Sequence, residues 1–221
     1  MGPMFSLWAQ SEAPVEVISH TLRQSSTGSL YVVGEVRNTY KEPLCFVQID
    51  ITYLDDKGNP VGVDRFTAKD AGTMAMDQVM ADRDVIPPGE TSSFSRVRDM
   101  SKIKGTVASC KVTAKGMRLR DGAMGATTSN VQVAKEGQSF HRVRGTFTAT
   151  GKARCKNPRA IAVGYDKSGQ AQVVSGSYLR DNSGKDINQL EPGQSASFNF
   201  LLNDDTGKVE TVKVFTSCEC E

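Results

Sequence analysis

The stretch SLYVVGEVRNTYKEPLCFVQIDITYLDDKGNPVG, from Ser29 to Gly62, decides the fold class of this chain. Its first part, Leu30 to Val36, is rich in apolar and β-branched residues, which favour a pleated, half-buried strand. Its second part, Cys45 to Leu54, alternates between apolar and polar side chains, which is typical of a strand with one buried face. The stretch therefore predicts two neighbouring strands of a larger antiparallel sheet.

Turn residues separate this stretch from further strands. Asp55 to Pro60 combines Gly and Asn, which tolerate positive φ, with Pro, which presets φ. Almost no helical periodicity is present, so the sequence predicts an all-β fold. The other predicted strands of the first half run from Val15 to Leu22, from Val61 to Phe66, from Thr91 to Val97 and from Thr106 to Leu119.

A looser copy of the pattern returns in the second half, which indicates tandem domains. We expect two tandem Ig-like antiparallel β-sandwich domains, because two packed sheets hide the apolar faces of such strands. The predicted domains are residues 13–119 and the divergent copy at 130–221, joined by a Gly-rich linker at 120–129. The matched pairs are Gly34 with Gly145, Tyr53 with Tyr165, Gly89 with Gly193, and Phe94 with Phe198.

The composition excludes several classes of function. The 221 residues carry a net charge of +2, so no nucleic-acid footprint is indicated. No apolar run approaches the ~20 residues needed to span a membrane. No phosphate-binding loop, nucleophile elbow or HExxH motif is present, and two histidines do not make a typical zinc site. We therefore expect no enzyme and no cofactor, and a protein partner.

The N-terminal residues are interpreted as a remnant of processing. Met1-Gly2-Pro3 resembles a cloning remnant. Phe5 to Gln10 resembles the end of a signal peptide's apolar region without the basic part that precedes it. The expectation is that a targeting sequence stood before this segment and was removed.

The cysteines bear on the compartment. Cys45 and Cys110 are separated by nearly the same distance in sequence as Cys155 and Cys218, and each pair joins an early strand of a repeat to its last. Strand alternation places Cys45 on the face of Val47, the predicted core face. We predict the disulfides Cys45–Cys110 and Cys155–Cys218, and hence the periplasm, the cell surface or the exterior. The alternative is five reduced, buried cysteines in a cytosolic protein.

The fifth cysteine, Cys220, has three open assignments. It is free, it replaces Cys218 as the partner of Cys155, or it bonds to another molecule.

Met74, Met76 and Met80 lie in the segment Thr67 to Asp84, which lacks strand alternation and is longer than its counterpart in the second copy. Thioethers are soft ligands that suit Cu(I), and Met76 and Met80 would share a face of a helix. The segment therefore suggests a copper site. The alternative is a short amphipathic helix whose flexible apolar side chains cap an open end of the sandwich.

Several motifs of the first repeat form a recognisable pattern. They are Leu30-Tyr31, Gly34-Glu35-Val36-Arg37-Asn38, the alternating strand from Ile49 to Asp55, Gly58, and Pro88-Gly89-Glu90 before Phe94. This pattern resembles the FxLYD-type domain, a small β-sandwich family of prokaryotic envelope and surface proteins. The second repeat departs from it, since Ala149 stands where the family has Asn. The resemblance implies an extracytoplasmic module for adhesion, assembly or scaffolding, with no catalytic residues.

The sequence thus predicts a non-enzymatic, extracytoplasmic binding or assembly protein. Its binding surface would be a sheet edge, which can accept a partner strand, or the groove between the two domains. The alternative is periplasmic copper handling through Met74, Met76 and Met80.

Overall fold

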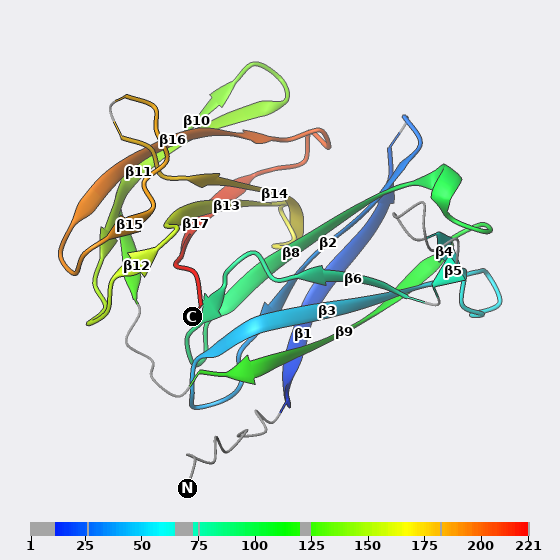
Figure 1. Ribbon diagram of the computed structural model, residues 1–221. Coiled ribbons are helices and arrows are strands. Elements are labelled where there is room, and N and C mark those ends of the chain that lie inside the picture. Colours follow the sequence, from blue (N-terminus) through cyan, green and yellow to red (C-terminus); the bar gives the residue numbers. More distant parts are fainter. Residues whose placement is uncertain are drawn as a thin grey trace, which may run out of the picture.

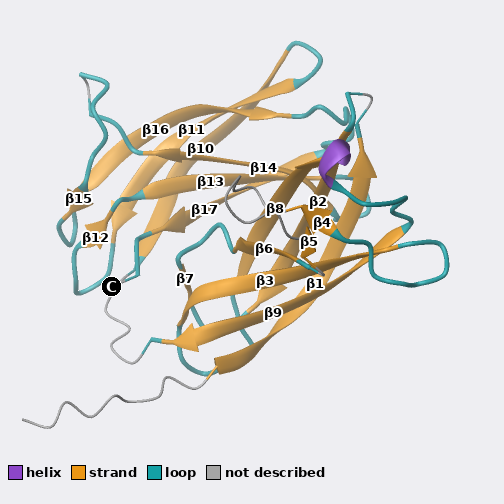
Figure 2. Cartoon of the chain, turned by 45° about the vertical axis from the view of Figure 1, so that its right-hand side comes forward, coloured by secondary structure: helices purple, strands orange, loops and turns teal. Residues whose placement is uncertain are grey.

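The computed structural model describes residues 12–25, 27–64, 73–74, 76–119, 125–181 and 183–220. Within them the protein is all-β with antiparallel pairing, and its one helix is the short 3-10 turn η1 (Met100–Lys102) (Figures 1 and 2). The strands of the first half are β1 (Glu12–Gln24), β2 (Ser29–Arg37), β3 (Leu44–Leu54), β4 (Val63–Asp64), β5 (Thr73–Met74), β6 (Asp77–Met80), β7 (Val85–Ile86), β8 (Thr91–Asp99) and β9 (Ser109–Arg118). Those of the second half are β10 (Ala126–Glu136), β11 (Phe140–Ala149), β12 (Cys155–Lys156), β13 (Arg159–Tyr165), β14 (Ala171–Tyr178), β15 (Gln189–Leu190), β16 (Ser195–Asn203) and β17 (Thr211–Ser217).

In the first half, β1 belongs to two layers. Its start, Glu12 to Val15, pairs with β9, and the rest pairs with β2. The strand order is β6-β3-β9-β1-β2-β8, and β7 also pairs with β3. The layers enclose a core that includes the predicted inward residues Val47, Ile49 and Tyr53. The alternation of β3 therefore correctly identified the buried face over this part of the strand.

The second half has its own sheets and its own core. The orders are β10-β11-β16 and β14-β13-β17, with a small β12-β15 pair beside them. Val143, Phe147 and Leu202 are fully buried between these sheets. Across the described ranges, no strand of one half pairs with a strand of the other. β10 begins at Ala126, inside the predicted linker, because the β-branched Thr127 and Thr128 extend the strand.

The same glycine–phenylalanine pair occurs in both halves. Gly34 lies opposite Phe94, and Gly145 lies opposite Phe198, so residues matched by the sequence repeat occupy corresponding positions in the two halves. A Cβ atom at Gly34 would lie 2.6 Å from the Phe94 ring and 2.4 Å from the Ser19 carbonyl oxygen. At Gly145 the Phe198 ring is equally close, at 2.6 Å. Only glycine therefore lets each ring cross its neighbouring strand.

Each pair sits beside an extra residue in the first strand of its half. The register of β1 on β2 shifts between Val17 and Ser19, and that of β10 on β11 shifts between Ser129 and Gln132. Such β-bulges bend a strand and increase its twist. The missing Cβ, the ring and the bulge together curve the sheet around each core.

The segment that carries the methionines contains strands rather than the predicted helical turn. Met74 ends β5, which pairs with β4, and Met80 ends β6, which pairs with β3. β6 is fixed by Asp77, whose buried carboxylate accepts hydrogen bonds from Arg96 and Arg98 of β8. This tertiary ion pairing overrides the local helical propensity of the segment.

Replacing either paired glycine with alanine should destabilise the protein. We expect Gly34→Ala and Gly145→Ala each to lower the free energy of unfolding by about 1–3 kcal/mol, because the added methyl overpacks against a buried ring. Chemical denaturation provides the measurement. Gly176→Ala is the matched control, since its Cβ would lie 3.6 Å from the nearest atom. Equal effects at all three positions would contradict this account of the Gly–Phe pairs.

Candidate functional site

The structure contains one of the two predicted disulfides. Cys155 and Cys218 are bonded, with their Cα atoms 5.0 Å apart in the core of the second half. Cys45 and Cys110 are both unbonded. Cys45 pairs with Met117 near one end of the β3–β9 ladder, whereas Cys110 pairs with Tyr53 near the other. At ~3.3 Å per residue this separates them by roughly 25 Å, far beyond disulfide reach.

The prediction that Cys45 lies on the core face of its strand failed because of a β-bulge. The register of β3 on β9 shifts between Cys45 and Gln48, and Phe46 has a positive φ of 49°. The extra residue reverses the alternation. Leu44 therefore enters the main core, and Cys45 faces a separate small cluster.

The methionines of the suggested copper site lie on or beside two short strands, with Met74 at the end of β5 and Met80 at the end of β6. Met76, just before β6, and Met80, at its end, are both exposed. Across the described ranges, no group of three or more His, Cys, Asp or Glu side chains has the arrangement of a metal site.

Beneath β6 lies a cluster of perturbed titratable groups. Burial would raise the pKa of Asp77, but the hydrogen bonds from Arg98 and Arg96 outweigh it and hold that pKa below its usual value. The Tyr53 hydroxyl lies 3.5 Å from the same carboxylate, and burial raises the pKa of this phenol. Because the charges are engaged with one another in the core, the cluster joins β3, β6 and β8 rather than offering a reactive group.

The two halves meet through a third apolar cluster. It contains Val33 of β2 together with Ile161, Val163 and Tyr165 of β13 and Ala171 of β14. The Tyr165 hydroxyl donates a 2.7 Å hydrogen bond to the Glu35 carboxylate, which is also buried. The outer face of β2 is therefore covered by the second half.

β13 is buried on both faces. Ala160 and Ala162 point into the core of the second half, whereas Ile161, Val163 and Tyr165 point toward the first. The sequence repeat matched Tyr53 with Tyr165, but their side chains point to different places. Tyr53 points into the core of its own half, whereas Tyr165 points toward the other half. The continuous apolar run from Ala160 to Tyr165 is the available signal, since strands covered on both faces lose their alternation.

Three consecutive residues after β6 hold the second half. The Asp82 carbonyl accepts a 2.6 Å bond from Arg159. Arg83 donates through Nε to the Thr216 carbonyl at 3.1 Å, and its Nη1 reaches the Glu90 carboxylate at 2.7 Å. Asp84 accepts from Ser217 Oγ at 2.7 Å. We call residues 82–84 the bracket; they end the longer segment that distinguishes the first copy.

A cavity of about 250 Å³ opens beside the bracket. Arg83, Glu90 and Thr216 are among its polar lining residues, and Val85 and Pro87 are among its apolar ones. Since Arg83 already bonds to Glu90 and Thr216, its charge is engaged within the junction. The two charged residues of the cavity lining, Arg83 and Glu90, are therefore already bonded to each other.

The sheet edge formed by β10 is more open. β10 pairs with β11 on one side, and no other described strand pairs with it. Residues 129–136 are exposed in succession, so both faces of this part of the strand reach solvent. The edge strands β8 and β16 both lie against β14. β17 meets β10 at its start, where Thr216 Oγ1 bonds to the Ala126 carbonyl.

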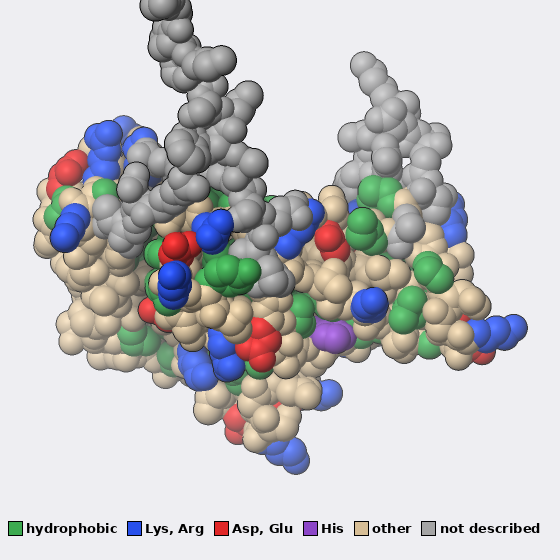
Figure 3. All heavy atoms as spheres, turned by 90° about the horizontal axis from the view of Figure 1, so that it is seen from below, with side chains coloured by type: hydrophobic (Ala, Val, Ile, Leu, Met, Phe, Trp, Pro, Cys, Tyr) green, Lys and Arg blue, Asp and Glu red, His purple; other side chains and the backbone are tan. Residues whose placement is uncertain are grey.

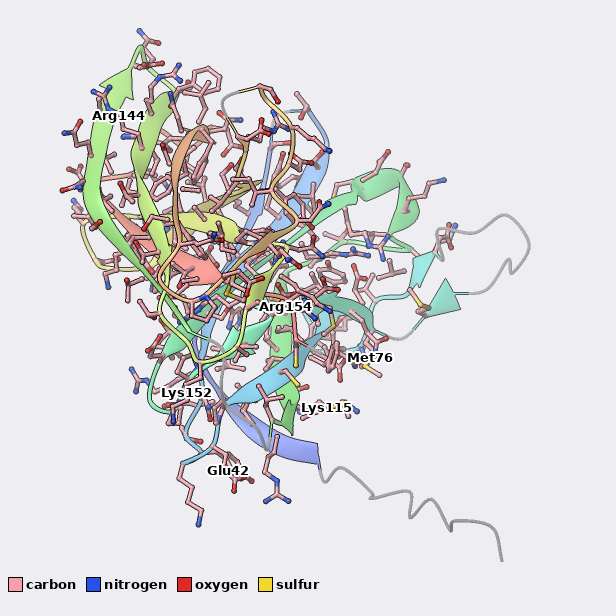
Figure 4. The ribbon with its side chains drawn as sticks, turned by 60° about the vertical axis from the view of Figure 1, so that its left-hand side comes forward. Glu42, Met76, Lys115, Arg144, Lys152 and Arg154 are labelled. Carbon is pink, nitrogen blue, oxygen red and sulfur yellow. A yellow bond between two sulfur atoms is a disulfide. The ribbon has the colours of Figure 1, made fainter. Side chains whose placement is uncertain are left out.

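The exposed part of β10 carries apolar side chains on its inner side. Val133 lies beside the buried Val143 of β11, and Val131 precedes it by two positions on the same side. Val133 is 41% exposed and Val131 is 40% exposed. A shallow hollow of about 330 Å³, lined by Gln132 and Arg144 among others, lies against β10 and β11. In Figure 4, Arg144 and Met76 lie on opposite sides of the molecule, so this edge is distinct from the methionine segment.

Charged side chains of both signs are mixed on one face of the described part of the molecule (Figure 3). His20 and His141 lie apart, the former 3.3 Å from the Cys110 carbonyl and the latter 3.6 Å from the Asp204 carboxylate. The described residues contain no helix that is both long and apolar enough to cross a membrane.

The bracket should make stability depend on pH. Burial raises the pKa of Asp82 to about 6, against the lowering effects of the Ser93 hydroxyl and Arg159, and Asp84 adds to the rise. The folded chain therefore binds this proton more tightly than the unfolded chain does. Its contribution to stability is present below pH ~4 and is lost as the pH rises through about 6.

We expect Asp82→Asn to remove this loss of stability with rising pH, because asparagine does not titrate. The difference in unfolding free energy between variant and wild type should change between pH 4 and pH 6 and be flat above pH 7. Asp166→Asn is a control of opposite sign, because hydrogen bonds from Ser168 and Gln170 lower the pKa of Asp166. Its difference should change below pH ~4. A difference for Asp82→Asn that is flat across the whole range would contradict the assignment.

Comparisons of the sequence with family models and with curated proteins find no match. Among solved structures, a red sea bream transglutaminase matches with a TM-score of 0.27 and 9% identity. The match covers 95% of this chain and 32% of that one, so this chain spans about a third of the transglutaminase's length. A likeness this weak carries no argument about fold or activity.

Proposed function

We propose that this protein is a non-enzymatic binding or assembly module that works outside the cytoplasm. In this proposal it consists of two tandem Ig-like β-sandwiches, of which the first is FxLYD-like and the second a divergent copy. Two separate cores and the repeated Gly34–Phe94 and Gly145–Phe198 pairs support the tandem arrangement. The buried Cys155–Cys218 disulfide supports an oxidising compartment.

The open edge of β10 is the observation that carries the proposed binding role. An exposed edge presents unpaired backbone groups, to which an extended segment of another protein can add as a strand. The bulge with positive φ at Asn130 interrupts the strand, so the run available for pairing is Val131 to Glu136. This length suits a partner strand of about five or six residues.

The two faces of this edge define the chemistry of the partner. Alternate side chains of an added strand would point to opposite faces of the sheet. One set would meet Val131 and Val133, which favours apolar residues. The other set would lie near the hollow beside Arg144, which favours acidic or polar residues. The proposed partner is therefore an extended segment with apolar residues alternating with acidic or polar ones.

Selection from a random peptide library displayed on phage, with the full chain immobilised, tests this proposal. We expect enrichment of alternating apolar and acidic peptides. Their binding, measured by calorimetry, should weaken at least about tenfold in the double variant Val131→Lys, Val133→Lys, because the added charges oppose burial of the peptide's apolar side chains.

Val97→Lys is the control, because Val97 is an exposed valine on the edge strand β8. Its peptide binding should be unchanged. Peptides that bind the double variant as tightly as the wild type would refute the β10 site, as would a selection that enriches no peptide.

A further inference from the structure

Two unbonded cysteines, one from each half of the chain, meet at the junction. Cys45 of β3 and Cys220, which follows β17, form one buried cluster with Val85, flanked by Met117 and Leu119. The two cysteines are 3% and 7% exposed. The two thiols lie close enough for each to shift the pKa of the other. In Figure 1 the red C-terminal end accordingly reaches the first half.

The position of Cys45 depends on a strained backbone. Regular alternation would direct Cys45 into the core with Val47, but the bulge at Phe46 turns it away from that core and into the cluster with Cys220. A positive φ at a bulky, non-glycine residue costs free energy. The bulge also leaves the Phe46 side chain 50% exposed. One result of this costly conformation is that Cys45 faces the second half.

The three residues before Cys220 are each bonded to another part of the structure. Cys218, two residues earlier, is bonded to Cys155. The amide of Glu219 donates a 2.9 Å hydrogen bond to the Lys156 carbonyl. Ser217 is bonded to Asp84 of the bracket. The approach of Cys220 to Cys45 therefore follows from anchored neighbours.

We propose that Cys45 and Cys220 are a disulfide-forming site that joins the two halves covalently. The oxidant is a small-molecule or protein disulfide. The Cys45 or Cys220 thiolate attacks it to give a mixed disulfide and release one thiol, and the second thiolate then displaces the other thiol. The two cysteines lose two protons and two electrons, and the oxidant is reduced to two thiols.

A metal is a poorer occupant of this site than a disulfide. Structural zinc takes four ligands, and the cluster supplies two thiols surrounded by Val85, Met117 and Leu119. Burial raises the pKa of both thiols, so they react slowly once the chain is folded. The bond therefore forms most readily while the chain folds. It links the two halves directly, whereas Cys155–Cys218 lies within one of them.

Thiol counting and peptide mapping test the proposal. The full chain is refolded in a buffer of reduced and oxidised glutathione, denatured without reduction, and treated with an alkylating agent. We expect one alkylated cysteine, Cys110, and two cross-linked peptide pairs, Cys155–Cys218 and Cys45–Cys220. Alkylation of both Cys45 and Cys220 would refute the proposal, as would a Cys155–Cys220 cross-link or glutathione retained on Cys45 or Cys220.

Single variants separate this bond from other pairings. Cys45→Ser and Cys220→Ser should each expose two thiols, because the partner loses its bond, and Cys110→Ser should expose none. Without the proposed bond, the wild type would expose three thiols and Cys110→Ser two. Because the wild type and Cys110→Ser alone distinguish the two cases, the test holds even if the other variants fold poorly.

Discussion

The pairing of a glycine with a phenylalanine across two strands is the constraint on which both halves depend. The Phe94 and Phe198 rings each lie 2.6 Å from the position that a Cβ atom of the facing glycine would take, which is too close for any side chain. This close approach fixes the register of three strands in each half. The glycine must lie between the phenylalanine on one neighbouring strand and the bulge on the other. A slip by one residue would move every side chain of a strand to the opposite face.

The all-β class and the antiparallel pairing were predictable from the sequence. The repeat, the alternation of β3 and the turn glycines are local features, and they correctly indicated antiparallel strands and the inward residues Ile49, Ile51 and Tyr53. Where a bulge interrupted the alternation, at Phe46, the prediction for Cys45 failed. A bulge inserts one residue without a strong sequence signal, so parity alone cannot detect it.

The candidate sites were less predictable because they depend on contacts between distant segments. The sequence distinguished the longer segment of the first copy but suggested a helical metal site there. In the structure, Asp77 of β6 is hydrogen-bonded to two arginines of β8. The end of the segment forms the bracket, which bonds to the second half. Arg83 and Asp84 bond to residues more than a hundred positions away. Local propensity contains no information about such partners.

The junction determines which surfaces remain for binding. The first half uses the outer face of β2 and the bracket to hold β13, β14 and β17. Apolar burial, the Tyr165–Glu35 bond and the Arg159–Asp84 ion pair act at different points of the same contact. Rotation of one half against the other would break several of them together. The opposite sheet of the second half faces away from this contact, so the open edge of β10 is presented at a fixed orientation to the first half. A partner strand bound there would lose little further freedom between the two halves, which favours assembly in a defined geometry.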